Sequence, residues 1–200
     1  MTTDINQLSK ALDNLTSAER YWIGYGVQDK GTSEGDNLYG ISLLILLYCP
    51  ERLSKQKCYE LATVNSLLKA KIKSTVRHKK NLTEQEKRDL IFSLSLELNS
   101  DTILELWNEY SAGETKEAQF VFDSNELSLV LQSKSYVDNG KLQPFVFATF
   151  LKNALQNTNI KSDVIKDRLK DLFKRAMANP DIKYNKVREI LNDLEETPSD

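Results

Sequence analysis

The chain carries few side chains of the kinds that hold transition metals. Its 200 residues include one histidine, His78, and two cysteines, Cys49 and Cys58. Zinc and similar ions are held mainly by imidazole and thiolate ligands. A site built from those ligands is therefore nearly excluded, and carboxylate or carbonyl oxygens remain as metal ligands. We expect His78, which stands in a basic stretch, to be a surface residue rather than a ligand or a general base.

Two pairs of acidic residues have a spacing that could build a carboxylate site. One pair is Asp123 and Glu126, and the other is Glu105 and Glu109. Side chains three or four residues apart lie on one face of a helix. Charge on a solvated helix surface commonly has this spacing, and we expect that role for both pairs.

A cluster of cations could contact the phosphates of a nucleic acid. No aromatic residues alternate with these cations, although aromatic side chains are what stack bases in single-stranded binding sites. We therefore expect a solvated helix end and loop, and nucleic-acid binding stays an alternative. The members of the cluster are Lys69, Lys71, Lys73, Arg77, His78, Lys79 and Lys80.

The overall composition indicates an ordinary globular protein without a strong electrostatic field. Lys and Arg number 27 against 29 Asp and Glu, a net charge of −2, so no global charge attracts nucleic acid or membrane. The first ten residues lack a signal peptide, and the longest apolar run, Leu43 to Cys49, is too short to cross a bilayer. Two cysteines are too few for a disulfide framework. We expect an intracellular protein, cytoplasmic or nuclear, with reduced core thiols and no membrane partner.

Apolar residues recur every three to four positions along most of the chain, which predicts helices. Seven Gly and four Pro are few for an all-β protein, because strands need many turns. The pattern predicts an all-α fold of about nine or ten helices in one domain. Residues suited to helix starts precede most segments. They are Thr16, Ser54, Thr83, Asp101, Thr115, Pro144 and Ser162.

One polar residue interrupts an apolar stripe. Leu61, Leu68 and Ile72 recur at helical spacing, and Asn65 stands on the same stripe where the period predicts an apolar side chain. We expect Asn65 to face the interior.

The segment Glu105–Val121, ELWNEYSAGETKEAQFV, joins a Trp-bearing helix, a Gly turn and a Thr-x-Glu-Ala start. It resembles a signature of the HD-domain metal-dependent phosphohydrolases, in the branch that contains the 5'-deoxynucleotidases. ERLSKQKCYELATVNS, Glu51–Ser66, is similar to that family's approach to its His-Asp pair, and SEGDNLYGISLLILL, Ser33–Leu47, to the segment with its first metal-binding His. The resemblance extends from about Leu15 to Phe173 and implies a single HD-domain-like helical domain.

The resemblance implies that all four metal-ligand positions are replaced. The family's first His falls on Asn37, its His-Asp pair on Asn65 and Ser66, and its last Asp on Asn125. By the same resemblance, an acidic residue implicated in hydrolysis falls on Lys69, whereas an Arg near the start of the pattern is kept as Arg20.

Loss of the ligands has a direct chemical consequence. Asn and Ser supply neither imidazole nitrogen nor negative charge, so a divalent ion is poorly held, and no water is acidified by it. We therefore expect no metal, no cofactor and no enzyme activity. This leading interpretation is a pseudoenzyme that acts through a protein partner, as a homodimer or as a subunit of a complex.

Three alternatives remain open. The first is a nucleoside 5'-monophosphate phosphohydrolase with a rearranged, carboxylate-based metal site. The second is a metal-free binding module, in which Arg20 and Lys69 hold the phosphate of a nucleotide, or the patch of Lys71, Lys73, Arg77, Lys79 and Lys80 holds nucleic acid. The third is that the four substituted positions are ordinary polar residues.

The end of the chain forms a separate segment. We expect residues 1–179 to form the HD-like domain and residues 180–200 to form an amphipathic helix with a frayed tail. Val187, Ile190 and Leu191 share one face of that helix. This face is expected to dock either on its own domain or on a partner.

Overall fold

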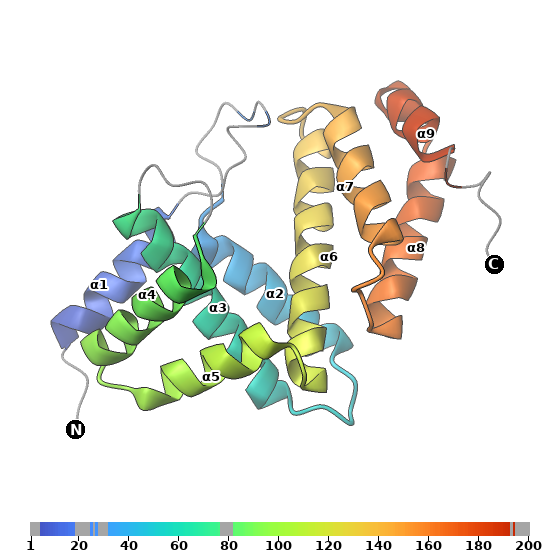
Figure 1. Ribbon diagram of the computed structural model, residues 1–200. Helices are drawn as coiled ribbons and strands as arrows, with labels where there is room; N and C mark the ends of the chain where they lie inside the picture. Colours follow the sequence, from blue (N-terminus) through green and yellow to red (C-terminus); the bar gives the residue numbers. More distant parts are fainter. Residues whose placement is uncertain are drawn as a thin grey trace. The chain divides into compact units, whose positions relative to one another are not determined.

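The computed structural model describes residues 5–18, 25, 27, 32–76, 82–192 and 194. These residues are mostly helical and contain no strand, which confirms the predicted all-α fold (Figure 1). The elements are α1 (Ile5–Ser17), α2 (Glu34–Tyr48), α3 (Lys55–Thr75), α4 (Glu84–Glu97), α5 (Asp101–Ala112), α6 (Lys116–Asp138), α7 (Pro144–Gln156), α8 (Asp163–Ala178), the 3₁₀ turn η2 (Ile182–Tyr184) and α9 (Asn185–Asn192).

The contacts divide the chain into two compact units. The first comprises residues 1–20 and 31–121, and the second comprises residues 21–30 and 122–200. This division falls inside α6, after Val121. Helices α1 to α5 thus belong to the first unit and α7 to α9 to the second, while α6 contributes to both. The predicted separation of residues 180–200 from the preceding domain stays a prediction.

Helix α3 is the centre of the first unit. It packs against α1, α2, α4 and α5. Leu61, Ala62 and Leu68 on α3 are at most 2% exposed. A helix with neighbours on several sides is apolar around much of its circumference instead of on one stripe. Any polar side chain that α3 turns inward is therefore surrounded by protein.

Side chains hold the starts of three helices in the first unit. Ser54 accepts a hydrogen bond from the first turn of α3, and Thr83 forms a reciprocal capping box with Glu86 at α4. Both predicted helix starts are confirmed. Helix α2 begins with the same arrangement of Ser33 and Asp36. Each such cap contributes about 1 kcal/mol, because it pairs an otherwise unsatisfied backbone amide.

The predicted helix start at Thr16 is wrong. Helix α1 continues to Ser17, and the Thr16 hydroxyl donates back to the carbonyls of its own helix at 3.2 Å. Ala11 and Leu15 are each 8% exposed, so tertiary packing carries the helix through the predicted break. Glu19, the other half of the predicted capping pair, lies outside the described residues.

In the second unit, a buried carboxylate of α6 holds the start of α8. Asp123 is 0% exposed, and its Oδ2 accepts the backbone amides of Lys161 at 3.0 Å and Ser162 at 2.6 Å. Ser162 itself makes no side-chain cap. The expectation that Asp123 is a surface charge is wrong, because local spacing does not reveal an acceptor role toward a segment so distant in sequence.

The last helix docks on its own unit, which was one of the two predicted alternatives. Helix α9 contacts α7 and α8. Tyr184, Val187 and Leu191 are each 0% exposed. The Tyr184 hydroxyl donates to Asp138 Oδ1 at 2.6 Å, which links η2 to the end of α6.

Helix α2 is apolar along most of its length, but it has only 15 residues. About 20 apolar residues are needed to cross the hydrocarbon core of a membrane. In the part of the chain that the structure describes, no helix has both the length and the apolar character for a membrane span.

Candidate functional site

Helices α2 and α3 pack antiparallel, and two contacts fix their register. At one end, Lys73 Nζ lies 2.5 Å from Glu34 Oε1. At the other, the sulfurs of the free thiols Cys49 and Cys58 lie 3.9 Å apart. The two contacts are fifteen residues apart along each segment, from Glu34 to Cys49 in the first and from Cys58 to Lys73 in the second. The two segments therefore run side by side over about 22 Å.

Three of the four predicted ligand positions are buried in this helix pair. Asn37 is 1% exposed, Asn65 3% and Ser66 0%. The burial of Asn65 agrees with its place on the apolar stripe. Asn65 Nδ2 and Ser66 Oγ have no hydrogen-bond partner among the described residues. A buried polar atom without a partner costs about 1–3 kcal/mol and calls for a functional explanation.

A buried ion pair stands beside these residues, and sequence reasoning missed it. The side chains of Glu34 and Lys73 are 4% and 15% exposed. Glu34 Oε2 has no hydrogen-bond partner among the described residues. Glu34 precedes Asn37 by one turn of α2, so both lie on the same face. Lys73 follows Asn65 by eight residues on α3, which is close to two helical turns. This spacing is the sequence feature that could have indicated that Lys73 lies on the same inward face as Asn65.

The two residues predicted to hold a phosphate have different outcomes. Lys69 is partly buried on α3, one turn before Lys73, so their side chains are neighbours on one face of the helix. Arg20 lies outside the described residues. Of the predicted phosphate-binding residues, Lys69 is thus the one whose place beside the buried ion pair is described.

Asn125, the fourth predicted ligand position, belongs to the second unit. It is partly buried on α6 and follows two fully buried residues, Asp123 and Ser124. Ser124 Oγ has no hydrogen-bond partner among the described residues. The second unit thus has its own buried polar residues, and the Asp123 carboxylate among them already caps α8.

The described lysines of the predicted nucleic-acid patch pair with carboxylates. Lys71 Nζ lies 2.5 Å from Glu97 Oε1, as Lys73 Nζ does from Glu34. Burial alone would raise the pKa of Glu97, but hydrogen bonds and charge from Lys71 outweigh burial and hold this pKa below its usual value. Three patch residues, Arg77, Lys79 and Lys80, lie outside the described part, as does His78.

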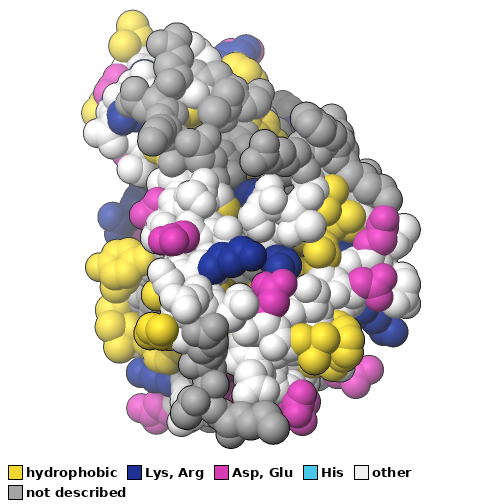
Figure 2. All heavy atoms as spheres, turned by 90° about the vertical axis from the view of Figure 1, so that its left-hand side faces the viewer, with side chains coloured by type: hydrophobic (Ala, Val, Ile, Leu, Met, Phe, Trp, Pro, Cys, Tyr) yellow, Lys and Arg dark blue, Asp and Glu magenta, His cyan; other side chains and the backbone are white. Residues whose placement is uncertain are grey.

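On the face drawn in Figure 2, which includes α1 and α4, described cations stand beside carboxylates and between hydrophobic patches. The described residues form no continuous cationic strip on this face. Nucleic-acid binding therefore stays a prediction that depends on the undescribed members of the patch.

The described residues do not fit a divalent metal. They contain no group of three or more His, Cys, Asp or Glu side chains placed to hold an ion. Asn37, Asn65 and Ser66 offer only neutral donors, and Glu34, whose carboxylate is the one beside them in the described part of the chain, is already paired with an ammonium. A divalent ion needs anionic ligands to offset its charge.

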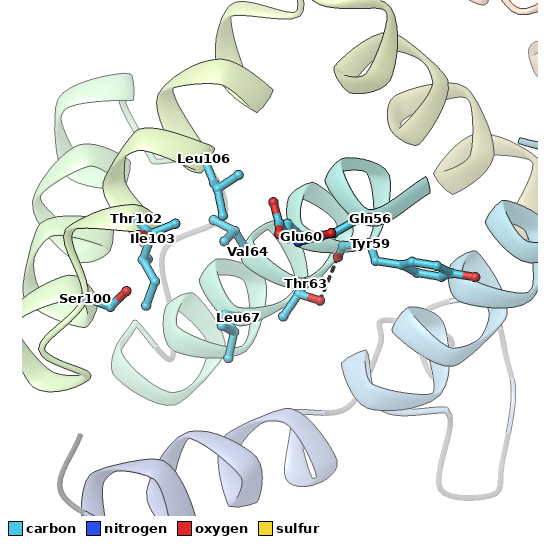
Figure 3. A pocket seen from close by; sticks show the side chains of 10 residues that line it. All are labelled: Gln56, Tyr59, Glu60, Thr63, Val64, Leu67, Ser100, Thr102, Ile103 and Leu106. Atoms are coloured by element: carbon cyan, nitrogen blue, oxygen red, sulfur yellow. Dashed lines mark hydrogen bonds between the residues drawn. The ribbon is translucent and has the colours of Figure 1, made fainter. Parts of the chain in front are cut away.

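A groove of about 540 Å³ lies on the opposite face of α3, against α5 (Figure 3). Val64, Leu67, Ile103 and Leu106 give it an apolar wall. Figure 3 shows the Thr63 hydroxyl donating to a carbonyl of its own helix, at 2.8 Å. This groove lacks the unpartnered polar atoms of the α2–α3 pair, so we place the candidate site at the α2–α3 pair.

Comparisons with known proteins support the family resemblance. The profile of the family described as HD domain matches residues 68–166. The 5'-deoxynucleotidase HDDC2 of Bos taurus is 29% identical over 138 residues, which cover 64% of this chain and 67% of that protein. The 5'-deoxynucleotidase hdd1 of Schizosaccharomyces pombe is 25% identical over 169 residues, which cover 76% and 84%.

A solved structure shows the same fold. The PH0347 protein from Pyrococcus horikoshii OT3 superimposes with a TM-score of 0.66 at 21% sequence identity, covering 84% of this chain and 98% of that chain. At this identity the likeness concerns the fold alone.

The prediction that the protein is not an enzyme is contradicted. Its curated relatives carry the name of an enzyme, 5'-deoxynucleotidase. The leading pseudoenzyme interpretation was drawn from the replaced ligand positions alone, and it gave those positions more weight than the whole chain supports. The assignment of Asn37, Asn65 and Ser66 to ligand positions rests on the sequence resemblance, since the family match begins after them, at residue 68.

The predicted all-α fold, the match over residues 68–166 and the relatives all agree with the resemblance carried by Glu105–Val121. Over residues 68–166 the chain is thus similar to the HD-domain family.

Proposed function

We propose that the protein is a phosphohydrolase acting on nucleoside 5'-monophosphates. The observation that supports this most is the set of relatives named 5'-deoxynucleotidase, which are 25–29% identical over 64–76% of this chain. The enzyme alternative weighed from the sequence thereby becomes the main hypothesis.

The α2–α3 pair offers the groups that such a reaction needs. Hydrolysis of a phosphate ester requires cations for the phosphate oxygens and a base for the attacking water. Lys69 and Lys73 provide the cations, and Glu34 Oε2 is a buried carboxylate oxygen that accepts no hydrogen bond from the described residues. Water attacks phosphorus and gives one proton to Glu34, the ester bond to the 5' oxygen breaks, and that oxygen takes the proton back from Glu34, which restores the carboxylate.

The proposal assigns no step to a metal ion. The donors of the described residues do not fit one, because Glu34 is paired with Lys73 and the other donors are neutral. The carboxylate-based metal site of the sequence alternative is therefore left out.

A phosphate-release assay on purified protein tests the proposal. Deoxynucleoside 5'-monophosphates are compared with the corresponding 3'-monophosphates, with and without added manganese or cobalt. We expect release from the 5' esters at least about tenfold faster than from the 3' esters, since each factor of ten corresponds to about 1.4 kcal/mol of discrimination. Absence of release from every 5' ester, with or without metal, would refute the proposal.

Two carboxylate variants distinguish loss of the catalytic base from loss of a negative charge that pairs with a lysine of α3. Glu34→Gln should abolish release because the base is lost. Glu97→Gln changes a carboxylate that is also paired with an α3 lysine at 2.5 Å, and it should keep release within about twofold, or 0.4 kcal/mol. Equal loss in both variants would remove Glu34 from the proposed reaction.

A further inference from the structure

The groove between α3 and α5 has an apolar floor. Val64 on α3 is 3% exposed, Ile103 and Leu106 on α5 are 8% and 6% exposed, and Leu67 adds to the wall. The volume of about 540 Å³ lies in the range of sites for small molecules. Water against apolar walls is readily displaced by apolar groups. The floor of the groove therefore favours the apolar part of a ligand.

Polar side chains stand at the two ends of this groove. Figure 3 shows Ser100 and Thr102 at the start of α5, and Gln56 and Glu60 in the first half of α3. Glu60 is partly buried, and its Oε1 accepts a hydrogen bond from Gln56 Nε2 at 2.9 Å. Among the described residues that line the groove, Glu60 carries the charge. A ligand in the groove thus meets neutral hydroxyls at one end and a carboxylate at the other.

Carboxylates outnumber cations at the Glu60 end. Lys57 Nζ lies 3.0 Å from Glu109 Oε2. The hydrogen bond to Glu109 raises the pKa of Lys57 above its usual value, and the charges of Glu60 and Glu105 add to the rise. Three carboxylates thus act on one ammonium, and that ammonium is paired with Glu109. A second cation placed at this end of the groove would be attracted.

The combination of floor and charge selects one class of ligand. An anion would be repelled by the carboxylates. A divalent metal ion needs several oxygen ligands, whereas the floor beside Glu60 is made of hydrocarbon side chains. A ligand with an apolar body and one ammonium group fits both the floor and the charge.

We propose that this groove binds a small organic amine in its ammonium form, with the apolar body on the floor and the ammonium beside Glu60. The proposal goes beyond the proposed function, because no residue of the α2–α3 site lines the groove. The groove is a second site, with a ligand of opposite charge to a nucleotide.

Three probes of equal chain length test the proposal: hexylammonium, hexan-1-ol and hexanoate. At neutral pH an alkylamine carries its proton and hexanoate is ionised. Each probe is titrated into the full chain at constant ionic strength, and the NMR signals of the Val64, Leu67, Ile103 and Leu106 methyl groups are followed. We expect hexylammonium to shift these signals with a dissociation constant of about 1–10 mM. Hexan-1-ol should bind about fivefold more weakly, and hexanoate more weakly still.

A shorter amine tests the role of the apolar floor. Each CH₂ group that is fully removed from water changes affinity by about fourfold. Butylammonium has two CH₂ groups fewer than hexylammonium and the same charge. It should therefore bind at least about fourfold more weakly, since the groove covers the chain only in part.

A charge variant tests the role of Glu60. Glu60→Gln keeps the size of the side chain, and it should weaken hexylammonium binding about fivefold, to the level of hexan-1-ol. Hexan-1-ol should bind the variant within about twofold of the wild type, which shows that the groove is intact. Glu84→Gln is the matched control, because it removes the same charge at a side chain that is 70% exposed on α4. It should change hexylammonium binding by less than about twofold.

Several results would overturn the proposal. Equal affinities for hexylammonium and hexan-1-ol would remove the role of the carboxylate. If up to about 50 mM hexylammonium shifts none of the four residues' methyl signals, the groove takes no such ligand. Methyl signals that shift when the protein is diluted, and not when the amine is added, would identify a second copy of the chain as the occupant. Phosphate release is measured separately, so each of these results leaves the proposed function standing.

Discussion

At the scale of single residues, the candidate site is marked by buried polar atoms that the fold does not satisfy. The inward place of Asn65 could be predicted, because a single stripe on one helix shows which face is buried. The pairing of Glu34 with Lys73 could not, since the two residues are 39 positions apart and no local spacing links them. The spacing of residues within one helix shows which face of that helix is buried, but the packing of helices against one another decides which side chains pair.

Replacement of Ser66 by alanine should stabilise the protein. The Ser66 hydroxyl is buried without a partner, so Ser66→Ala removes a desolvated group and raises the free energy of unfolding by about 1 kcal/mol. Ser95 is the control, because its buried hydroxyl donates to a carbonyl at 2.9 Å. Ser95→Ala should be neutral or destabilising by about 0.5 kcal/mol in urea denaturation. Equal effects of the two changes would show that Ser66 has a partner in solution.

Removal of the Asp123 carboxylate should destabilise the second unit. Asp123→Ala leaves two backbone amides at the start of α8 without their acceptor, and we expect a loss of about 3 kcal/mol. Asp163→Ala is the control on the same helix start, because the Asp163 side chain is 89% exposed. It should change stability by less than about 0.5 kcal/mol. A comparable loss in both variants would mean that general charge, and not the buried cap, stabilises α8.

At the scale of elements, most helix starts could be predicted because capping side chains are local signals. Ser54 and Thr83 are caps, as predicted, whereas Thr16 is not, since the packing of Leu15 carries α1 onward. For α8 the predicted start at Ser162 is correct, but Ser162 makes no side-chain cap. Instead, Asp123 of α6 accepts the backbone amide of Ser162.

The end of α5 depends on a left-handed backbone residue. Gly113 has φ +64°, and no atom lies near a Cβ added there, so Gly113→Ala should cost about 1 kcal/mol from the backbone alone. Gly35 lies inside α2, and a Cβ there would meet its nearest atoms at 3.4 Å, an ordinary contact. Gly35→Ala should therefore be neutral or stabilising by about 0.5 kcal/mol. Thermal denaturation compares the two, and a destabilising Gly35→Ala would contradict this packing.

The junction of α6 with η2 should respond to acid. Burial alone would raise the pKa of Asp138, but hydrogen bonds from Lys134 and Tyr184 outweigh burial and hold this pKa below its usual value. A lowered folded-state pKa stabilises the protein above the unfolded pKa of about 3.9, and this contribution is lost as pH falls through the folded pKa.

The stability difference between wild type and Asp138→Asn should thus be larger at about pH 7 than at about pH 3. Asp171→Asn is the control, because Asp171 pairs with Arg175 on an exposed face. Urea denaturation at both pH values checks the difference, and an Asp138→Asn effect that does not shrink in acid would contradict it.

At the scale of the whole molecule, the all-α fold class and the resemblance to the HD-domain family could be predicted from the sequence, whereas the two contact units could not. Hydrophobic period and the resemblance around Glu105–Val121 both depend on sequence alone. The division inside α6 depends on which helices contact one another. The sequence pattern of α6 is that of one continuous helix, so it does not indicate a division after Val121. The predicted protein partner, homodimer and intracellular location stay predictions.

The central claim is that a chain similar to the HD-domain family, with amide and hydroxyl side chains at its predicted ligand positions, hydrolyses nucleoside 5'-monophosphates. The most direct measurement is steady-state phosphate release from deoxyadenosine 5'-monophosphate by the purified wild type, in EDTA and in manganese. Lys73→Met protein purified in the same way gives the background. The account predicts release above that background in EDTA, within a few-fold of the rate in manganese. Release no faster than that background in both buffers would contradict it.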